Sequence, residues 1–94
     1  MKQQNQQKQL PIGAAPEDLK GRYSNLMQIT HTQEEFVLDF FNIVAGSGAL
    51  VARVTLSPGH LKRIVKTLEI NFKKYEDKFG ATEAAEEPEN KIGF

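Results

Sequence analysis

Asp39 and Arg53 are two opposite charges in segments that have a strand pattern, and they form the chain's best candidate for a buried polar site. In the register predicted below, Arg53 lies opposite Phe41 and diagonal to Asp39, within reach of a long side chain. We expect the two charges to pair, because an unpaired charge in an interface is costly. The alternative is an ordinary cross-strand ion pair on a partly wet sheet face. Two charges without a base or a nucleophile make no reaction, so we expect no catalysis here.

The sequence contains few residues that could bind a metal or a cofactor. The chain has no cysteine and two histidines, His31 and His60, and it contains no HxxH or HExxH spacing. The Ser57-Pro58-Gly59 turn lacks the lysine-bearing glycine frame of a phosphate loop and is better explained as the start of a helix. We therefore expect no metal, no cofactor and no enzymatic activity.

The basic residues of segment 60–80 are candidate phosphate contacts. Six basic residues stand there against three acidic ones, a modest excess, and the strands carry no aromatic–basic motif for RNA. A solvated helix face with i,i+4 partners such as Glu69 and Lys73 is the competing interpretation. A dimer would double the patch, so nucleic-acid binding stays as the alternative function. The residues of this face are Lys62, Arg63, Lys66, Lys73 and Lys74.

The element that carries these charges is a predicted helix from Ser57 to Gly80. Ser57 is suited to the N-cap and Pro58 to the first helical position, while Gly80 suits a left-handed C-terminal cap. Apolar residues recur at steps of three and four, which places them along one side of a helix. This apolar stripe consists of Leu61, Ile64, Val65, Leu68, Phe72, Tyr75 and Phe79.

Three strands are predicted before the helix, at residues 22–31, 35–44 and 50–56, with a glycine-rich hairpin connection at 45–49. If the hairpin closes symmetrically, Phe40 faces Val54 and Leu38 faces Leu56, on the side expected to receive the helix. The middle strand is apolar on both faces, so both faces of the sheet need cover, and a single helix covers only one of them. The simplest cover for the second face is a second copy of the chain. The predicted dimer face consists of Val37, Asp39, Phe41, Ile43, Val51 and Arg53.

The ends of the chain differ from its middle. Residues 1–20 are rich in glutamine and proline and residues 81–94 are acidic, so we expect both to be disordered, with Ile92 and Phe94 as a weak anchor. The single domain, 21–80, is then about 60 residues long and marginal alone, which favours self-association. No run approaches the ~20 apolar residues of a membrane span, and no secretory signal is present, so we expect a cytoplasmic protein.

Several short runs together resemble a family of small bacterial and archaeal proteins, the domain of unknown function 3467. They are YSN at 23–25, TH at 30–31, FVLDF at 36–40, ARVTLSP at 52–58, LKR at 61–63 and KYEDKFG at 74–80. Many relatives favour alanine where this chain has Leu61, and the hairpin varies in length. The resemblance covers about Arg22 to Gly80 and supports the fold. It implies no activity, cofactor or catalytic residue.

We therefore predict an α+β fold, a three-stranded antiparallel β-meander followed by one long C-terminal amphipathic helix (β-β-β-α). The helix is expected on one face of the sheet, and the opposite face is expected to bind a second copy. The predicted function is a small non-catalytic homodimeric interaction or regulatory module, with a further protein as a possible partner and no membrane. The alternative is a nucleic-acid-binding or transcription-associated protein that uses the basic helix face.

Overall fold

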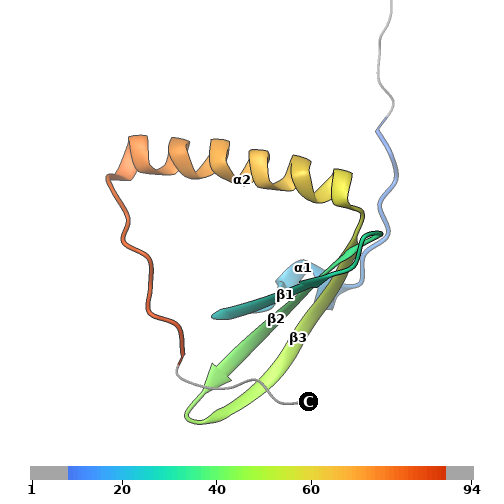
Figure 1. The fold of residues 1–94 in the computed structure, drawn as a ribbon, viewed down its shortest axis with the longest axis horizontal. Helices are drawn as coiled ribbons and strands as arrows, with labels where there is room; N and C mark the ends of the chain where they lie inside the picture. Colours follow the sequence, from blue (N-terminus) through green and yellow to red (C-terminus); the bar gives the residue numbers. More distant parts are fainter. Residues whose placement is uncertain (1–8, 89–94) are drawn as a thin grey trace, which may run out of the picture.

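The fold is an antiparallel sheet followed by a long helix (Figure 1). The computed structural model describes residues 9–88. Its elements are α1 (Pro16–Lys20), β1 (Leu26–His31), β2 (Phe36–Val44), β3 (Ser47–Leu56) and α2 (Pro58–Phe79). The predicted order of three antiparallel strands and a C-terminal helix is confirmed.

The strands lie in chain order, β1-β2-β3, with β2 in the centre. Cross-strand partners form three rows: Met27 with Phe40 and Ala52, Ile29 with Leu38 and Val54, and His31 with Phe36 and Leu56. Since side chains alternate between the two faces of a strand, these nine residues share one face. We call it the open face of the sheet.

The β2–β3 connection is tighter than the symmetric closure about 45–49 predicts, and that predicted register is wrong. Val44 pairs with Ser47, so the loop has two residues, Ala45 at φ 51° and Gly46 at φ 77°. Positive φ at both positions is typical of the hairpin turn that matches strand twist. A register shift between Phe40 and Phe41 then leaves Val51 without a Cα partner, as in a β-bulge.

The first strand is shorter than the sequence pattern predicts, because its ladder is continued by a side chain. Asn25 donates from Nδ2 to the Ile43 carbonyl and accepts from the Ile43 N–H at Oδ1, both at 2.9 Å. Its backbone N–H also donates to the Phe41 carbonyl at 3.0 Å. The amide side chain thus satisfies the backbone groups that another paired residue would satisfy.

Helix α1 lies inside the segment 1–20 for which the sequence predicts a disordered tail. Pro16 occupies its start, where a missing N–H costs nothing, and Asp18 accepts a hydrogen bond from the Ala15 N–H at 2.9 Å. All five residues of this helix are exposed. The predicted anchor residues Ile92 and Phe94 lie outside the described part of the chain.

Helix α2 has the N-cap that the sequence predicts, whereas Gly80 ends the helix at positive φ but with ψ 172°, outside the predicted left-handed conformation. The Ser57 hydroxyl accepts from the His60 N–H at 3.1 Å, and Gly80, at φ 99°, donates its N–H to the Glu76 carbonyl at 2.8 Å. Its predicted packing on Leu38, Phe40, Val54 and Leu56 is wrong within one chain, because α2 has no substantial contact with any strand. Ser57 is the only residue between β3 and α2, and it is extended, as a residue before proline prefers. The helix therefore leaves the sheet at an angle (Figure 1).

The chain buries little of itself. Among the described residues only Phe41 and Asp39 are buried. The accessible surface is 8338 Å² for a chain of 10.6 kDa, whereas a compact monomer of that mass exposes about 5,500 Å². Residues 9–15 and 81–88, which form no helix or strand, contribute to the excess, and so do the apolar side chains of α2.

Candidate interaction surface

The Asp39–Arg53 pair is present and lies at the centre of the sheet. Arg53 donates from Nε to Asp39 Oδ1 at 2.6 Å and from its terminal nitrogen to Oδ2 at 2.9 Å. The two residues are direct cross-strand partners, not diagonal ones, because the β2–β3 register differs from the predicted one. A two-pronged contact of this kind fixes the geometry of both side chains.

The pair shifts the titration of both its members. The hydrogen bonds from Arg53 lower the pKa of Asp39, partly opposed by burial of the carboxylate. In turn the Asp39 carboxylate raises the pKa of Arg53. The carboxylate is the more enclosed partner, with 9% of its side chain exposed against 53% for Arg53. Both groups therefore stay charged in the folded chain, and neither is suited to donate or accept a proton in a reaction.

The structure brings together five of the six residues of the predicted dimer face. Val37, Asp39, Phe41 and Ile43 alternate along β2, and Arg53 joins them from β3. Val51 is the sixth residue and is not on this face. The bulge displaces it, and it lines a hollow beside α1 together with Phe40 and Ala52. Leu50 takes its place as the partner of Phe41. The sequence gives no clear signal for this exchange, since the bulge cannot be read from alternation.

The open face of the sheet is largely apolar, with His31 as its one polar residue, and partly exposed. Its central row consists of Ile29, Leu38 and Val54, and none of its nine residues is Asp, Glu, Lys or Arg. Met27, Ile29 and Val54 are each between 42% and 44% exposed. Large side chains on a packed sheet face are usually covered, so most of this surface lacks its cover in one chain. Only Phe40 and Ala52, in its first row, border the hollow beside α1.

The apolar stripe of α2 is the second uncovered surface. Leu61 and Ile64, next to the junction with β3, are half-buried, but from Val65 onward every residue of the stripe is exposed, with maxima of 63% at Leu68 and 66% at Phe79. Aromatic rings continue the stripe, with ring centroids 5.9 Å apart for Phe72 and Tyr75 and 4.9 Å apart for Tyr75 and Phe79. No described residue of α2 is buried.

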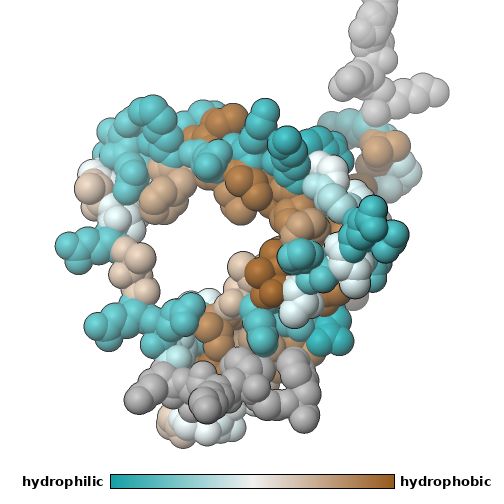
Figure 2. Space-filling model, in the orientation of Figure 1, coloured by the Kyte–Doolittle hydropathy of each residue, from teal (hydrophilic) through white to brown (hydrophobic). Residues whose placement is uncertain are grey.

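Helix α2 and the sheet stand apart in the single chain. Figure 2 shows an opening between them, with hydrophobic side chains on part of its inner wall and hydrophilic side chains over the outside of the helix. Because α2 has no substantial contact with any strand, the stripe and the open face are both left without an apolar partner in one chain.

Comparison with known proteins supplies a family for this architecture. The family model described as "Protein of unknown function (DUF3467)" matches residues 1–84, which include all three strands and the whole of α2. The chain belongs to the DUF3467 family. No curated protein and no solved structure matches it.

The basic residues of this DUF3467 chain lie on the side of α2 away from the apolar stripe. Lys73 pairs with Asp77 at 3.1 Å, not with Glu69, and Arg63 contacts the His60 ring nitrogen at 3.0 Å. Lys62, Lys66 and Lys74 are exposed on the same side, as helical spacing requires. The predicted nucleic-acid face is thus one surface, interrupted by the acidic partner of Lys73.

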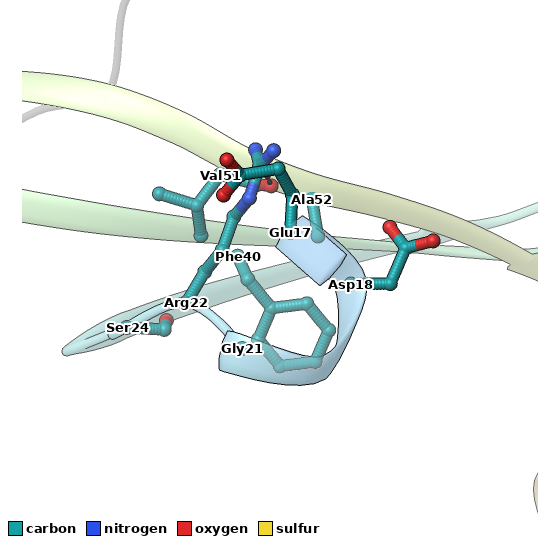
Figure 3. Close-up of a pocket in the computed structure, with 8 residues that line it drawn as sticks. All are labelled: Glu17, Asp18, Gly21, Arg22, Ser24, Phe40, Val51 and Ala52. Atoms are coloured by element: carbon teal, nitrogen blue, oxygen red, sulfur yellow. Dashed lines mark hydrogen bonds between the residues drawn. The ribbon is translucent and has the colours of Figure 1, made fainter. Parts of the chain in front are cut away.

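The hollow beside α1 has a volume of about 420 Å³ and lies between that helix and the sheet (Figure 3). Arg22 closes one side of it by donating from Nη1 to the Val51 carbonyl at 3.1 Å, next to the bulge. The Ser24 hydroxyl in its wall is directed at the backbone carbonyls of Leu26 and Phe41, at 3.1 and 3.0 Å. These contacts attach the segment after α1 to the sheet and leave no activated nucleophile. The other lining residues are Glu17, Asp18, Gly21, Phe40 and Ala52.

Within residues 9–88, no three His, Cys, Asp or Glu side chains gather in a way that could hold a metal ion. In the same part of the chain, no helix is both long and apolar enough to cross a membrane.

Proposed function

We propose that this DUF3467 chain is a small non-catalytic interaction module that acts as a homodimer. One observation carries the proposal: the apolar stripe of α2 and the open face of the sheet are both uncovered in the single chain. A soluble chain that exposes two such surfaces usually covers them with a partner.

The magnitude of the missing burial supports this. Fully burying a large apolar side chain is worth about 1.5–3 kcal/mol, so covering the remaining half of such a residue is worth roughly 1 kcal/mol. The uncovered residues of the stripe and the open face together are therefore worth on the order of 10 kcal/mol. Whole domains are stable by about 5–15 kcal/mol. A partner on these surfaces would thus decide whether the chain is stably folded.

The chemistry of the two surfaces favours protein over nucleic acid. Neither the stripe nor the open face contains a charged residue, whereas binding to nucleic acid depends on cationic contacts with phosphates. The Asp39–Arg53 pair is satisfied within the sheet and lacks a neighbouring base or nucleophile among the residues described. A binding role fits these features better than a reaction does.

The proposal is tested by thermal unfolding of the full chain at a series of protein concentrations. If two copies fold together, the midpoint temperature rises as the concentration rises, because dissociation accompanies unfolding. A monomer has a midpoint that does not depend on concentration. A constant midpoint from low to high micromolar concentration would overturn the proposal.

A further inference from the structure

We infer that α2 of one copy packs on the second copy, with its apolar stripe on the second copy's open face, and that the exchange is reciprocal. This inference rests on the proposed homodimer and specifies its interface. It differs from the pairing through Val37, Phe41 and Ile43 that the sequence predicts.

The junction between β3 and α2 is the first support. Ser57 is fixed on both sides: its hydroxyl accepts from the His60 N–H, its carbonyl accepts from the Leu61 N–H at 3.0 Å, and Pro58 follows it. With no other linker residue, and with Ser57 restricted to extended backbone by Pro58, the chain has little freedom to turn α2 back onto its own sheet. In the single chain α2 therefore has no substantial contact with its own open face, and its stripe is left uncovered.

Helix α2 is longer than the open face that it is proposed to cover. It has 22 residues, about 33 Å at 1.5 Å per residue. On β3 the open face runs only from Ala52 to Leu56, five residues or about 16 Å at 3.3 Å per residue. A second copy of α2 is thus more than long enough to cover the open face. Because each copy supplies one helix and one sheet face, a two-fold arrangement satisfies both surfaces at once.

The two faces of the sheet differ in how much apolar side-chain surface is still exposed. Phe41 and Asp39 are already buried, and the Arg53 guanidinium is bonded to Asp39. By contrast, Met27, Ile29 and Val54 on the open face are each more than two-fifths exposed. The open face also carries no charge that a helix stripe of Leu, Ile, Val and aromatic residues would have to desolvate. An apolar helix therefore fits the open face and not the opposite one.

Cysteine cross-linking between copies tests the inference, and the chain has no native cysteine to interfere. One full-length chain carries Leu68→Cys on the stripe and a second, distinguished by a size tag, carries Val54→Cys on the open face. The two are unfolded together, refolded as a mixture and treated with a short flexible bis-maleimide. The control mixture carries Ile70→Cys, on the opposite side of α2, and Thr55→Cys, on the opposite face of β3.

We expect the Leu68→Cys and Val54→Cys chains to form a cross-linked heterodimer at a yield at least tenfold above the control mixture. A dimer by sedimentation with no excess of this product overturns the inference and leaves the homodimer standing. Equal yields in both mixtures overturn it too, since they report random collision. A monomer by sedimentation overturns the homodimer itself. Circular dichroism of each variant checks that it folds, and Ile29→Cys replaces Val54→Cys if it does not.

Discussion

Asp39 and Arg53 face each other directly across β2 and β3, joined by hydrogen bonds of 2.6 and 2.9 Å. The pair gives the two faces of the sheet different characters. One face holds a satisfied charge pair beside the buried Phe41, and the other is uncharged and half-exposed. This asymmetry is the reason why we assign the helix of a second copy to the open face.

The pair predicts a dependence of stability on acid. The pKa of Asp39 is lower in the folded chain than in the unfolded one, so the ionised carboxylate stabilises the fold. Its contribution is complete above the unfolded pKa of about 3.9 and is lost as the pH falls through the lower folded pKa. We expect Asp39→Asn to flatten the fall in the free energy of unfolding below about pH 4. Urea titrations at several pH values measure this.

A matched control separates this effect from a general loss of surface charge. Asp77 pairs with Lys73 on the exposed side of α2, where an i,i+4 pair is worth only about 0.3–0.5 kcal/mol. The Asp77→Asn variant should keep the acid dependence of the wild type. If both variants show the same pH profile as the wild type, the Asp39–Arg53 pair does not have the stabilising role given to it.

Substitutions at two apolar residues of α2 test whether a second copy covers the stripe. Leu68 lies on the stripe and Ile70 on the opposite side, and in the single chain they are 63% and 57% exposed. We expect Leu68→Glu to raise the dimer Kd about a hundredfold or more, because it removes roughly 1 kcal/mol of apolar contact and also places a charge against an apolar face, where it loses its water. Ile70→Glu should leave Kd within about threefold, as expected of a surface substitution. Equal effects in sedimentation equilibrium would contradict the assignment.

The same comparison applies to the sheet. Val54 lies on the open face, and its neighbour Thr55 lies on the opposite face as the partner of Val37. We expect Val54→Glu to weaken the dimer by a factor similar to that of Leu68→Glu, and Thr55→Glu to leave it nearly unchanged. The measurement is the dimer Kd of each variant. A larger effect of Thr55→Glu would favour the face formed by Val37, Asp39 and Phe41.

The hairpin turn offers a stabilising change. Ala45 adopts φ 51°, which costs a residue with a Cβ about 1–2 kcal/mol unless the side chain can tolerate it. Asn tolerates this conformation, and Asn-Gly is the preferred pair for such a two-residue loop. We expect Ala45→Asn to increase the free energy of unfolding by about 0.5–1 kcal/mol, measured in urea. Ala45→Val should decrease it, and the reverse order would contradict the assigned turn.

Local patterns predict much of this fold. The spacing of Leu61, Ile64 and Leu68, with caps at both ends, predicts α2 within one residue, because those signals depend only on neighbouring residues. Alternation predicts the three strands. It cannot predict the bulge at Val51 or the turn at Ala45, since an extra residue changes the register without changing the composition.

The position of α2 is the largest difference between the pattern and the structure. An amphipathic stripe shows that a helix needs an apolar partner, but it does not say which chain supplies it. The direction in which α2 leaves the sheet depends on the backbone of one residue, Ser57. The apolar surface that the sequence predicts is therefore present, while the face expected to receive the helix is open.

Sedimentation equilibrium of the unmodified full chain tests the central claim, that a second copy covers the stripe of α2, most directly. We predict a mass of twice 10.6 kDa at high micromolar concentration, with dissociation on dilution. A mass of 10.6 kDa throughout that range would contradict the claim, because α2 would then remain exposed in solution as it is in the single chain.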